Sequence, residues 1–152
     1  MYQRILLPTD GSDLARSAAA HGIALAKYVG AEVVAVYASP PFETPAGFEF
    51  VPAPLLPVDA YEDGAKAAAK RYLGELTALA ASAGVPARCE HLRALSPADA
   101  IVACAKDQAC DLIVIGSHGR GALRHLLLGS VTNRVLMLCT VPVLVHRAPD
   151  GA

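Results

Sequence analysis

Hydrophobic residues occur along the chain in two alternating patterns. Short, nearly continuous apolar runs are typical of strands that are buried on both faces of a sheet, and five such runs predict strands at residues 4–9, 32–38, 87–92, 111–116 and 141–146. Between most of these runs, apolar residues recur every three or four positions, as they do on one face of a helix. This second pattern predicts helices over residues 12–29, 59–82, 97–109 and 129–138.

The order of these elements predicts an α/β fold. Strands that alternate with helices are joined by right-handed crossovers, which produce a doubly wound parallel sheet with helices on both faces. Such sheets bind ligands outside the carboxyl ends of their strands, where the strand order reverses. Two strand ends carry loop residues suited to that role, Pro-Thr-Asp-Gly-Ser at 8–12 and Gly-Ser-His-Gly-Arg-Gly at 116–121.

Residues 39–58 interrupt the alternation of strands and helices. They contain six prolines, and proline breaks helices and removes a ladder donor from central strands. We therefore expect one long loop between the second predicted strand and the second predicted helix.

Composition narrows the classes of function. Hydrophobic residues make up 54% of the 152 residues and charged residues 18%, which supplies one buried core and argues against a disordered chain. The formal net charge of −1 and the absence of Trp disfavour nucleic acid as a partner. No apolar run approaches the roughly eighteen residues of a membrane span, and the apolar start is too short for a signal peptide. We therefore expect a cytoplasmic protein that does not bind a membrane.

The four cysteines do not form a recognisable metal or redox motif. None of them shows Cys-x-x-Cys spacing, and none has a companion histidine at metal-finger spacing. We predict that they act as small core residues; they are Cys89, Cys104, Cys110 and Cys139.

The segment from Gly116 to Ser130 carries the most specific chemistry. Gly116 and Gly119 follow a predicted strand, whereas Gly129 and Ser130 begin the next predicted helix. Glycine lets a backbone approach a polyphosphate closely, and the N–H groups of such a loop and of a helix start bind anions. The pattern matches neither the P-loop nor the dinucleotide-binding glycine signature. It nevertheless predicts a nucleotide ligand.

The spacing Gly-x2-Gly-x9-Gly-Ser, which begins at Gly116, resembles the ATP-binding signature of the universal stress protein family. The opening Ile-Leu-Leu-Pro-Thr-Asp-Gly-Ser at 5–12 looks like that family's first strand and turn, and Pro-Val-Leu-Val at 142–145 looks like its closing strand. The resemblance spans essentially the whole chain. One departure is Leu95, which stands where the family usually has a glycine before the third helix.

The resemblance implies a particular architecture. The family has a five-stranded parallel sheet of order 3-2-1-4-5, with helices on both faces, of the adenine nucleotide α-hydrolase-like type. We expect this architecture in a single nucleotide-binding domain over residues 1–147, followed by a C-terminal tail at 148–152.

The resemblance also implies ATP as the ligand. Asp10 would accept hydrogen bonds from the ribose hydroxyls, and the backbone at Ala38 would contact the adenine edge. Pro8 and Thr9 would line the nucleoside end. Six residues would wrap the phosphates, largely through backbone N–H groups: Gly116, His118, Gly119, Gly129, Ser130 and Val131. The expected ATP-binding set also includes Ile115, Arg120 and Thr132. The residues themselves suggest that Arg120 adds a charge-assisted contact and that the hydroxyls of Ser130 and Thr132 are offered to phosphate or to its metal. Mg²⁺ or Mn²⁺ would be carried by the phosphates, without a cage of protein side chains.

Two of these residues also have a purely structural interpretation. Asp10 is also suited to a turn in which its side chain accepts a hydrogen bond from the following backbone. His118 is either a phosphate ligand or base, or a neutral loop histidine with a single backbone hydrogen bond. Ser117 and His118 are neighbours in sequence, which does not make a catalytic triad, so we assign no catalytic residue.

The closing strand predicts an interface. Pro142 removes a ladder donor, which fits an edge strand or the first residue of a strand. A bare edge of Val143, Leu144 and Val145 would invite aggregation unless a second copy covered it. The family dimerises through this strand, so we expect a homodimer through these three residues.

Three functions remain open at this stage. The first is an ATP-binding stress or signalling protein whose nucleotide occupancy is sensed by an unknown protein partner, with weak ATPase activity at best. The second is a dimeric, stress-associated interaction protein that binds no nucleotide. The third is an ATP-hydrolysing or adenylating enzyme of the wider α-hydrolase-like group, which the Pro-Thr-Asp-Gly-Ser turn disfavours because it lacks a repeated Ser-Gly pattern.

Overall fold

The computed structural model describes residues 1–43, 52, 55, 57–118 and 128–147. Most of the predicted loop at 39–58 lies outside the described residues, as do Gly119, Arg120 and the predicted tail at 148–152.

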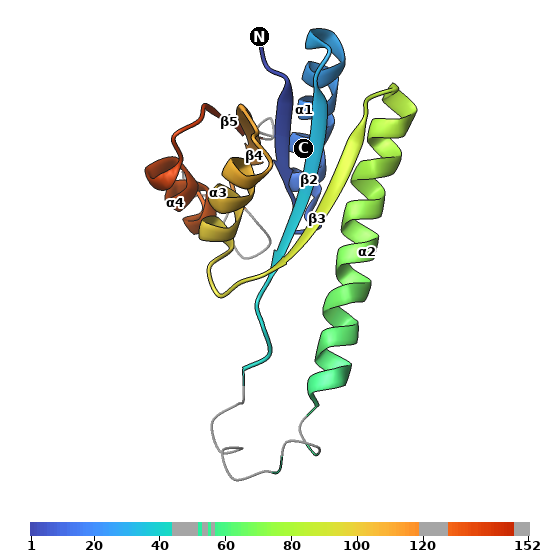
Figure 1. Ribbon diagram of the computed structural model, residues 1–152, viewed down its shortest axis with the longest axis vertical. Coiled ribbons are helices and arrows are strands. Elements are labelled where there is room, and N and C mark those ends of the chain that lie inside the picture. The colour runs from blue at the N-terminus through green and yellow to red at the C-terminus, as the bar shows by residue number, and fades with distance from the viewer. Residues whose placement is uncertain (44–51, 53–54, 56, 119–127, 148–152) are drawn as a thin grey trace.

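The core of the molecule is one parallel sheet whose strand order is β3-β2-β1-β4-β5 (Figure 1). The predicted order and the predicted parallel arrangement are both confirmed. The strands are β1 (Arg4–Pro8), β2 (Glu32–Ser39), β3 (Ala87–Arg93), β4 (Leu112–Gly116) and β5 (Val143–His146). The last strand begins two residues later than predicted, because Pro142 has no N–H to donate and contributes only its carbonyl, which accepts from Ile113 (3.0 Å).

Two helices cover each face of the sheet. They are α1 (Asp13–Val29), α2 (Val58–Ala83), α3 (Pro97–Asp107) and α4 (Ser130–Leu138). The first two pack on one face and the last two on the other, as the two separate core clusters show. Helix α3 ends two residues earlier than predicted, because Ala109 has a positive φ of 51° and so leaves the helical region.

Strand residues alternate between the two cores. Leu7 and Val33 point to the α1 and α2 side, whereas Leu6 and Val34 point to the α3 and α4 side, as the period of two along a strand requires. All four are buried. The central strands are therefore apolar on both faces, which explains their continuous hydrophobic runs.

The cysteines follow the prediction only in part. Cys104 and Cys110 are buried, and burial raises the pKa of their thiols to about 11 and about 12, respectively. Cys139 is half-buried. Cys89 is exposed, so its assignment to the core was wrong. It lies on β3, which is an edge strand, and edge positions next to solvent bury less than central ones.

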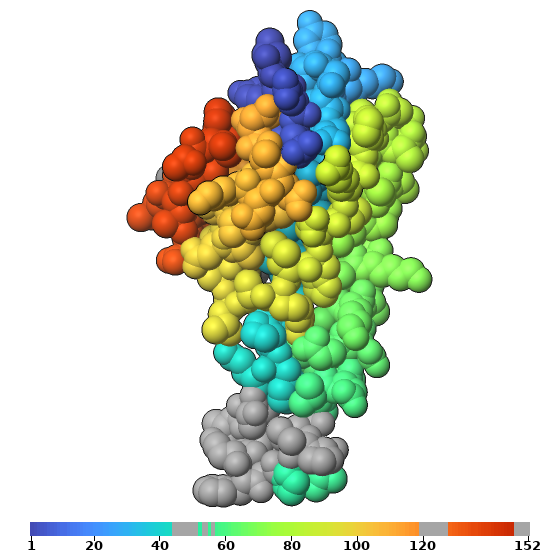
Figure 2. Space-filling model, in the orientation of Figure 1, coloured from blue at the N-terminus to red at the C-terminus, as the bar shows by residue number. Residues whose placement is uncertain are grey.

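The long helix α2 reaches past the end of the sheet. Its first turns lie beside residues 40–43, as the space-filling view shows (Figure 2). Tyr61 of α2 makes an edge contact with Phe42 (5.5 Å between ring centroids) and donates a hydrogen bond to the Pro40 carbonyl (3.0 Å). Across the described part of the chain, no helix has both the length and the apolar character to cross a bilayer.

Candidate functional site

The turn after β1 is held by its own short side chains. The Asp10 carboxylate accepts from the Ser12 N–H (3.0 Å), and the Thr9 hydroxyl oxygen accepts from the Gly11 N–H (3.1 Å). The turn role considered for Asp10 is therefore real. Gly11 has a φ of +77°, and a Cβ there would overlap the ring of Tyr72. Glycine is required at this position for both reasons.

The segment after β4 is built from closely packed backbone. The Gly129 N–H donates to the Ser117 carbonyl (2.7 Å), so the chain returns directly against the end of the strand. A Cβ at Gly129 would lie 3.0 Å from the Cα of His118. Any side chain at this position would push the two stretches of backbone apart, so glycine suits their close approach.

Helix α4 presents its amino-terminal end to the same place. Its N-cap is Gly129, which offers no side-chain oxygen to the first N–H groups. The first amides of a helix have no acceptor within the helix and carry its positive dipole end. The backbone at Ser130 and Val131 therefore suits an anion.

Thr132 contributes to the site indirectly. Its buried hydroxyl donates to the Gly116 carbonyl (2.8 Å), which fastens α4 to the end of β4. We predicted a hydroxyl offered to phosphate, whereas this hydroxyl proton is already given to the backbone. Thr132 thus holds the segment in shape.

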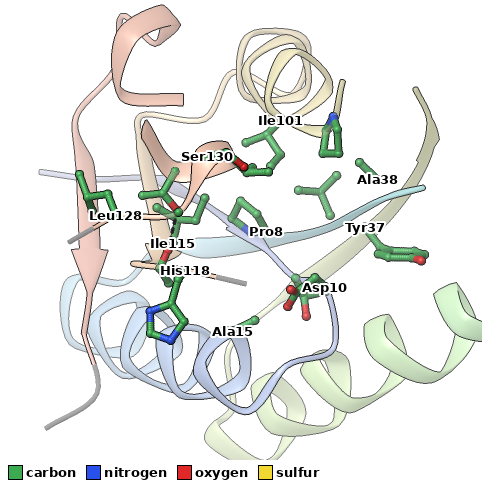
Figure 3. Close-up of a pocket in the computed structure, with 17 residues that line it drawn as sticks. Pro8, Asp10, Ala15, Tyr37, Ala38, Ile101, Ile115, His118, Leu128 and Ser130 are labelled. Carbon is green, nitrogen blue, oxygen red and sulfur yellow. Dashed lines mark hydrogen bonds between the residues drawn. The ribbon is translucent and has the colours of Figure 1, made fainter. Parts of the chain in front are cut away.

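These elements enclose one cavity of about 620 Å³, a volume typical of small-molecule sites. The cavity lies at the carboxyl ends of the strands. It lies at the point where the strand order reverses, because β2 and β3 are on one side of β1 and β4 and β5 are on the other. Figure 3 shows Asp10 and Tyr37 at one end and His118 and Leu128 at the other. The predicted nucleotide residues within the described part of the chain all line it, namely Pro8, Thr9, Asp10, Ala38, Ile115, Gly116, His118, Gly129, Ser130, Val131 and Thr132.

The sequence analysis missed several residues of the cavity wall. They are Ala15, Val36, Tyr37, Pro97, Ile101 and Leu128. Val36 and Tyr37 directly precede Ala38, so the strand pattern itself could have pointed to them. The α3 residues carry no such signal, because only the crossover of the chain brings that helix over the carboxyl ends of the strands.

The cavity holds few groups that titrate. The His118 Nδ1 shares a hydrogen bond with the Ser117 hydroxyl (3.1 Å), so among the described residues the bond of this ring is made to a side chain. Ser117 is buried and does not line the cavity. This pair is thus poorly placed to attack a bound ligand. Among the described residues, no three His, Cys, Asp or Glu side chains are grouped to hold a metal ion.

Comparison with known proteins identifies relatives of this chain. The profile of the universal stress protein family matches residues 1–147. The chain is 38% identical over 154 aligned residues to universal stress protein MJ0531 of Methanocaldococcus jannaschii, which covers 98% of this chain and 84% of that protein. It is 35% identical over 147 residues to a universal stress protein of Thermus aquaticus, which covers 97% of this chain and 100% of that protein.

Solved structures agree with these relationships. Protein MJ0577 of Methanocaldococcus jannaschii superimposes with a TM-score of 0.82 at 28% identity, over 99% of each chain. A universal stress protein in complex with cAMP has a TM-score of 0.70 at 24% identity, over 97% of this chain and 98% of that one. The universal stress protein of Archaeoglobus fulgidus in complex with dAMP has a TM-score of 0.69 at 23% identity, over 95% and 97%. The last two comparisons establish the shared fold, and the sequence matches establish more: the chain belongs to the universal stress protein family.

Proposed function

We propose that this universal stress protein binds ATP in the cavity between the β1 turn and the start of α4. The observation that carries the proposal is the convergence of two different chemistries in one cavity. A carboxylate and strand-end backbone lie at one end, and glycine backbone with helix N–H groups lies at the other. Two proteins of the same fold are known in complex with adenine nucleotides, cAMP and dAMP, which supports this choice of ligand.

In the proposed complex, the two ends of the cavity have separate tasks. Asp10 accepts hydrogen bonds from the ribose hydroxyls, and the backbone at Ala38 meets the adenine edge. The phosphates lie against the backbone of Gly116 and Gly129, which has no side chain to displace. They also meet the first amides of α4, which carry partial positive charge. Mg²⁺ or Mn²⁺ accompanies the phosphates and keeps much of its water.

The proposed role is that of a nucleotide-dependent signalling protein. Bound ATP joins the turn after β1 to the start of α4, and a protein partner in the stress response distinguishes the occupied from the empty form. Ser117 and His118 are poorly placed as a nucleophile and base, so hydrolysis would be slow and driven by positioning and the metal alone.

Binding is tested by calorimetric titration of the chain with ATP and Mg²⁺, with mass spectrometry of any nucleotide that co-purifies. We expect saturable binding that is lost in Gly129→Val. Gly74→Ala is a matched control, because a Cβ at Gly74 of α2 has no neighbour within 4 Å. Absence of binding at millimolar ATP would refute the proposal and favour the interaction protein without nucleotide.

We also propose a homodimer through β5. This strand is an edge of the sheet, and its residues Val143, Leu144 and Val145 are only half-buried in the single chain. Covering that edge with the same strand of a second copy satisfies its unpaired backbone groups. Sedimentation should show a dimer at micromolar protein, and a monomer there would contradict the proposal.

A cytoplasmic location completes the proposal. The four cysteines are free thiols, as is usual in a reducing compartment. Location is checked by fractionation of the producing cell, and recovery of the chain outside the cytoplasm would contradict it.

A further inference from the structure

The end of β2 is attached to one neighbouring strand and not to the other. Pairing of β1 with β2 stops at Pro8 and Val36, and the last backbone bond between the two runs from the Thr9 N–H to the Val36 carbonyl (2.9 Å). Pairing of β2 with β3 continues three residues further, to Ser39. Tyr37 therefore lies beyond the β1 ladder. Its position relative to the Asp10 turn depends on side chains.

Aromatic rings make that connection. Tyr37 meets Tyr72 of α2 edge to face, with 5.3 Å between ring centroids and 82° between planes. Tyr72 is buried, and its ring lies where a side chain at Gly11 would be. The ring of Tyr72 thus touches both the turn that carries Asp10 and the strand that leads to Ala38. Such ring contacts add to the free energy of plain burial.

Tyr37 also stacks on a histidine. His91 is the cross-strand neighbour of Tyr37 on β3, and the two rings stack at 5.4 Å with 16° between planes. The His91 Nε2 also lies 2.8 Å from the Ser39 hydroxyl. The Tyr72–Tyr37–His91 stack therefore runs from the β1 turn to the outer strand of the sheet.

A chain of hydrogen bonds sets the protonation state of His91. The Arg93 guanidinium donates to the Ser39 hydroxyl oxygen and to the Glu62 carboxylate, each at 2.5 Å. Because Ser39 accepts from Arg93, its own proton is best placed to go to the His91 Nε2. That nitrogen must then be the unprotonated acceptor. A neutral His91 completes the chain, whereas a protonated one adds a second cation beside Arg93.

We propose that the Tyr72–Tyr37–His91 stack positions the nucleoside end of the cavity, and that protonation of His91 weakens nucleoside binding without weakening binding of the phosphates. The inference rests on the proposed function and deepens it. Tyr72 and His91 do not line the cavity and act through Tyr37, Asp10 and Ala38, so they are positioning residues. Tyr37 both lines the cavity and carries the contacts of the stack. The described residues of the phosphate end belong to β4, α4 and the residues next to them, and they contribute no ring to this stack.

The charges around His91 set the direction of the acid effect. Arg93 lies on the same strand, Glu62 on α2 and Tyr37 on β2, with Arg71 of α2 placed over the Tyr72 ring (4.8 Å). Burial and then Arg93 lower the pKa of His91, and Glu62 opposes them in part. His91 is therefore neutral at neutral pH and gains its proton only below its ordinary value of 6.5.

Two probes separate the ends of the cavity. ATP occupies both ends, whereas inorganic tripolyphosphate occupies only the phosphate end. Tripolyphosphate also shows how much of the change in affinity with pH comes from protonation of the phosphates themselves. Calorimetry at about pH 7.5 and about pH 5.5 brackets the ordinary histidine pKa. The variants are Tyr37→Leu, which removes the ring, and His91→Phe, which keeps a stacked ring that cannot take a proton. Tyr28→Leu is the matched control, because Tyr28 is 89% exposed.

We expect Tyr37→Leu to bind ATP about tenfold more weakly, because a tenfold change in affinity is close to the free energy of one aromatic ring contact. Its affinity for tripolyphosphate should be unchanged. Tyr37→Phe should restore most of that loss. In the wild type, ATP affinity should fall in acid by more than tripolyphosphate affinity, and His91→Phe should abolish this excess.

Several results would overturn the inference. Parallel losses of ATP and tripolyphosphate in Tyr37→Leu, or an unchanged affinity for ATP, would contradict positioning. If ATP affinity still falls in acid by more than tripolyphosphate affinity in His91→Phe, His91 is not the source of that difference. This measurement tests the inference even if Tyr37→Leu fails to fold. A wild-type chain that binds neither ATP nor tripolyphosphate would refute the proposed function and this inference together, whereas wild-type binding with unaffected variants refutes the inference alone.

Discussion

The two ends of the cavity are made in different ways. The phosphate end is main chain: Gly129 crosses against His118, and the first turn of α4 supplies its amides. The nucleoside end is supported by side chains from three elements, in which Tyr37 stacks with His91 and meets Tyr72 edge to face. A site made of backbone needs particular small residues at fixed spacing, so it leaves a motif in the sequence. A site made of packed side chains needs only that distant residues meet in space.

The difference also separates what each end contributes to binding. Backbone amides are fixed by the hydrogen bonds of the fold, so the phosphate end should tolerate changes of distant side chains. The nucleoside end depends on ring contacts and on one chain of hydrogen bonds that starts at Glu62. It should respond to smaller changes, including a change of pH.

The strongest way to break the phosphate end is Gly129→Val. The new side chain would collide with the backbone at His118, and we expect ATP and tripolyphosphate affinities both to fall by about a hundredfold, near 3 kcal/mol. Overpacking should also lower the free energy of unfolding by about 1–3 kcal/mol. Calorimetry and urea denaturation measure the two effects. Gly74→Ala should keep full binding and gain up to about 1 kcal/mol of stability. A similar loss of ATP affinity in that control would contradict the requirement for close backbone contact at Gly129.

Asp10→Asn isolates the nucleoside end. The amide oxygen still accepts from the Ser12 N–H and preserves the turn, but the charge that strengthens bonds to ribose hydroxyls is gone. We expect ATP affinity to fall about tenfold, or about 1.4 kcal/mol, with tripolyphosphate affinity equal or higher. Competition between the two ligands in one titration measures the ratio directly. Equal losses for both would mean that Asp10 supports the cavity as a whole.

Thr132→Val sharpens the distinction between shaping the phosphate end and contacting the ligand. The substitution keeps the volume and removes the hydroxyl that donates to the buried Gly116 carbonyl. We expect the free energy of unfolding to fall by about 1 kcal/mol, and Thr132→Ser, which keeps the donor, to restore it. Urea denaturation provides the measurement. If ATP affinity falls while stability does not, the hydroxyl contacts the ligand after all.

The smallest expected effect concerns the contact between α3 and α4, two helices that both contribute to the cavity wall. Arg134 of α4 donates to both carboxylate oxygens of Asp99 on α3, at 3.1 and 3.0 Å. This contact with Arg134, followed by a hydrogen bond with Ser96, lowers the pKa of Asp99 below its ordinary value of 3.8. A lowered carboxyl pKa stabilises the fold above the ordinary value, and the contribution is lost as the pH falls through the lowered one.

Arg134→Gln should therefore be slightly less stable than the wild type near neutral pH, and the difference should disappear in strong acid. Because both side chains are largely exposed, solvent screens the pair and the difference stays small. Thermal unfolding across a pH series measures it, with high salt as a second way to remove it. A difference that grows in acid would show that the pair does not act through Asp99.

Features that depend on local backbone rules could be predicted from the sequence, whereas features that depend on distant side-chain contacts could not. The alternation of strands and helices, the parallel sheet and the first turn were predictable from the residues, because continuous apolar runs and glycine punctuation depend on local rules. The strand order was predicted only through the resemblance to the universal stress protein family. The described residues of the glycine motif were found in the cavity that the motif predicts. The hydroxyl of Thr132 was misjudged, since its acceptor is sixteen residues away in the chain. The exposure of Cys89 was missed because composition does not reveal which strand lies at an edge.

The amino-acid sequence by itself determined the α/β alternation, the two strand-end segments and the glycines that let backbone meet backbone, because each of these depends on neighbours within a few residues. Only the tertiary structure decided that Tyr37, Tyr72 and His91 form one stack and that α3 closes the cavity. Those contacts join residues tens of positions apart, and the register of β2 on β3 and the packing of α2 on the sheet bring them together.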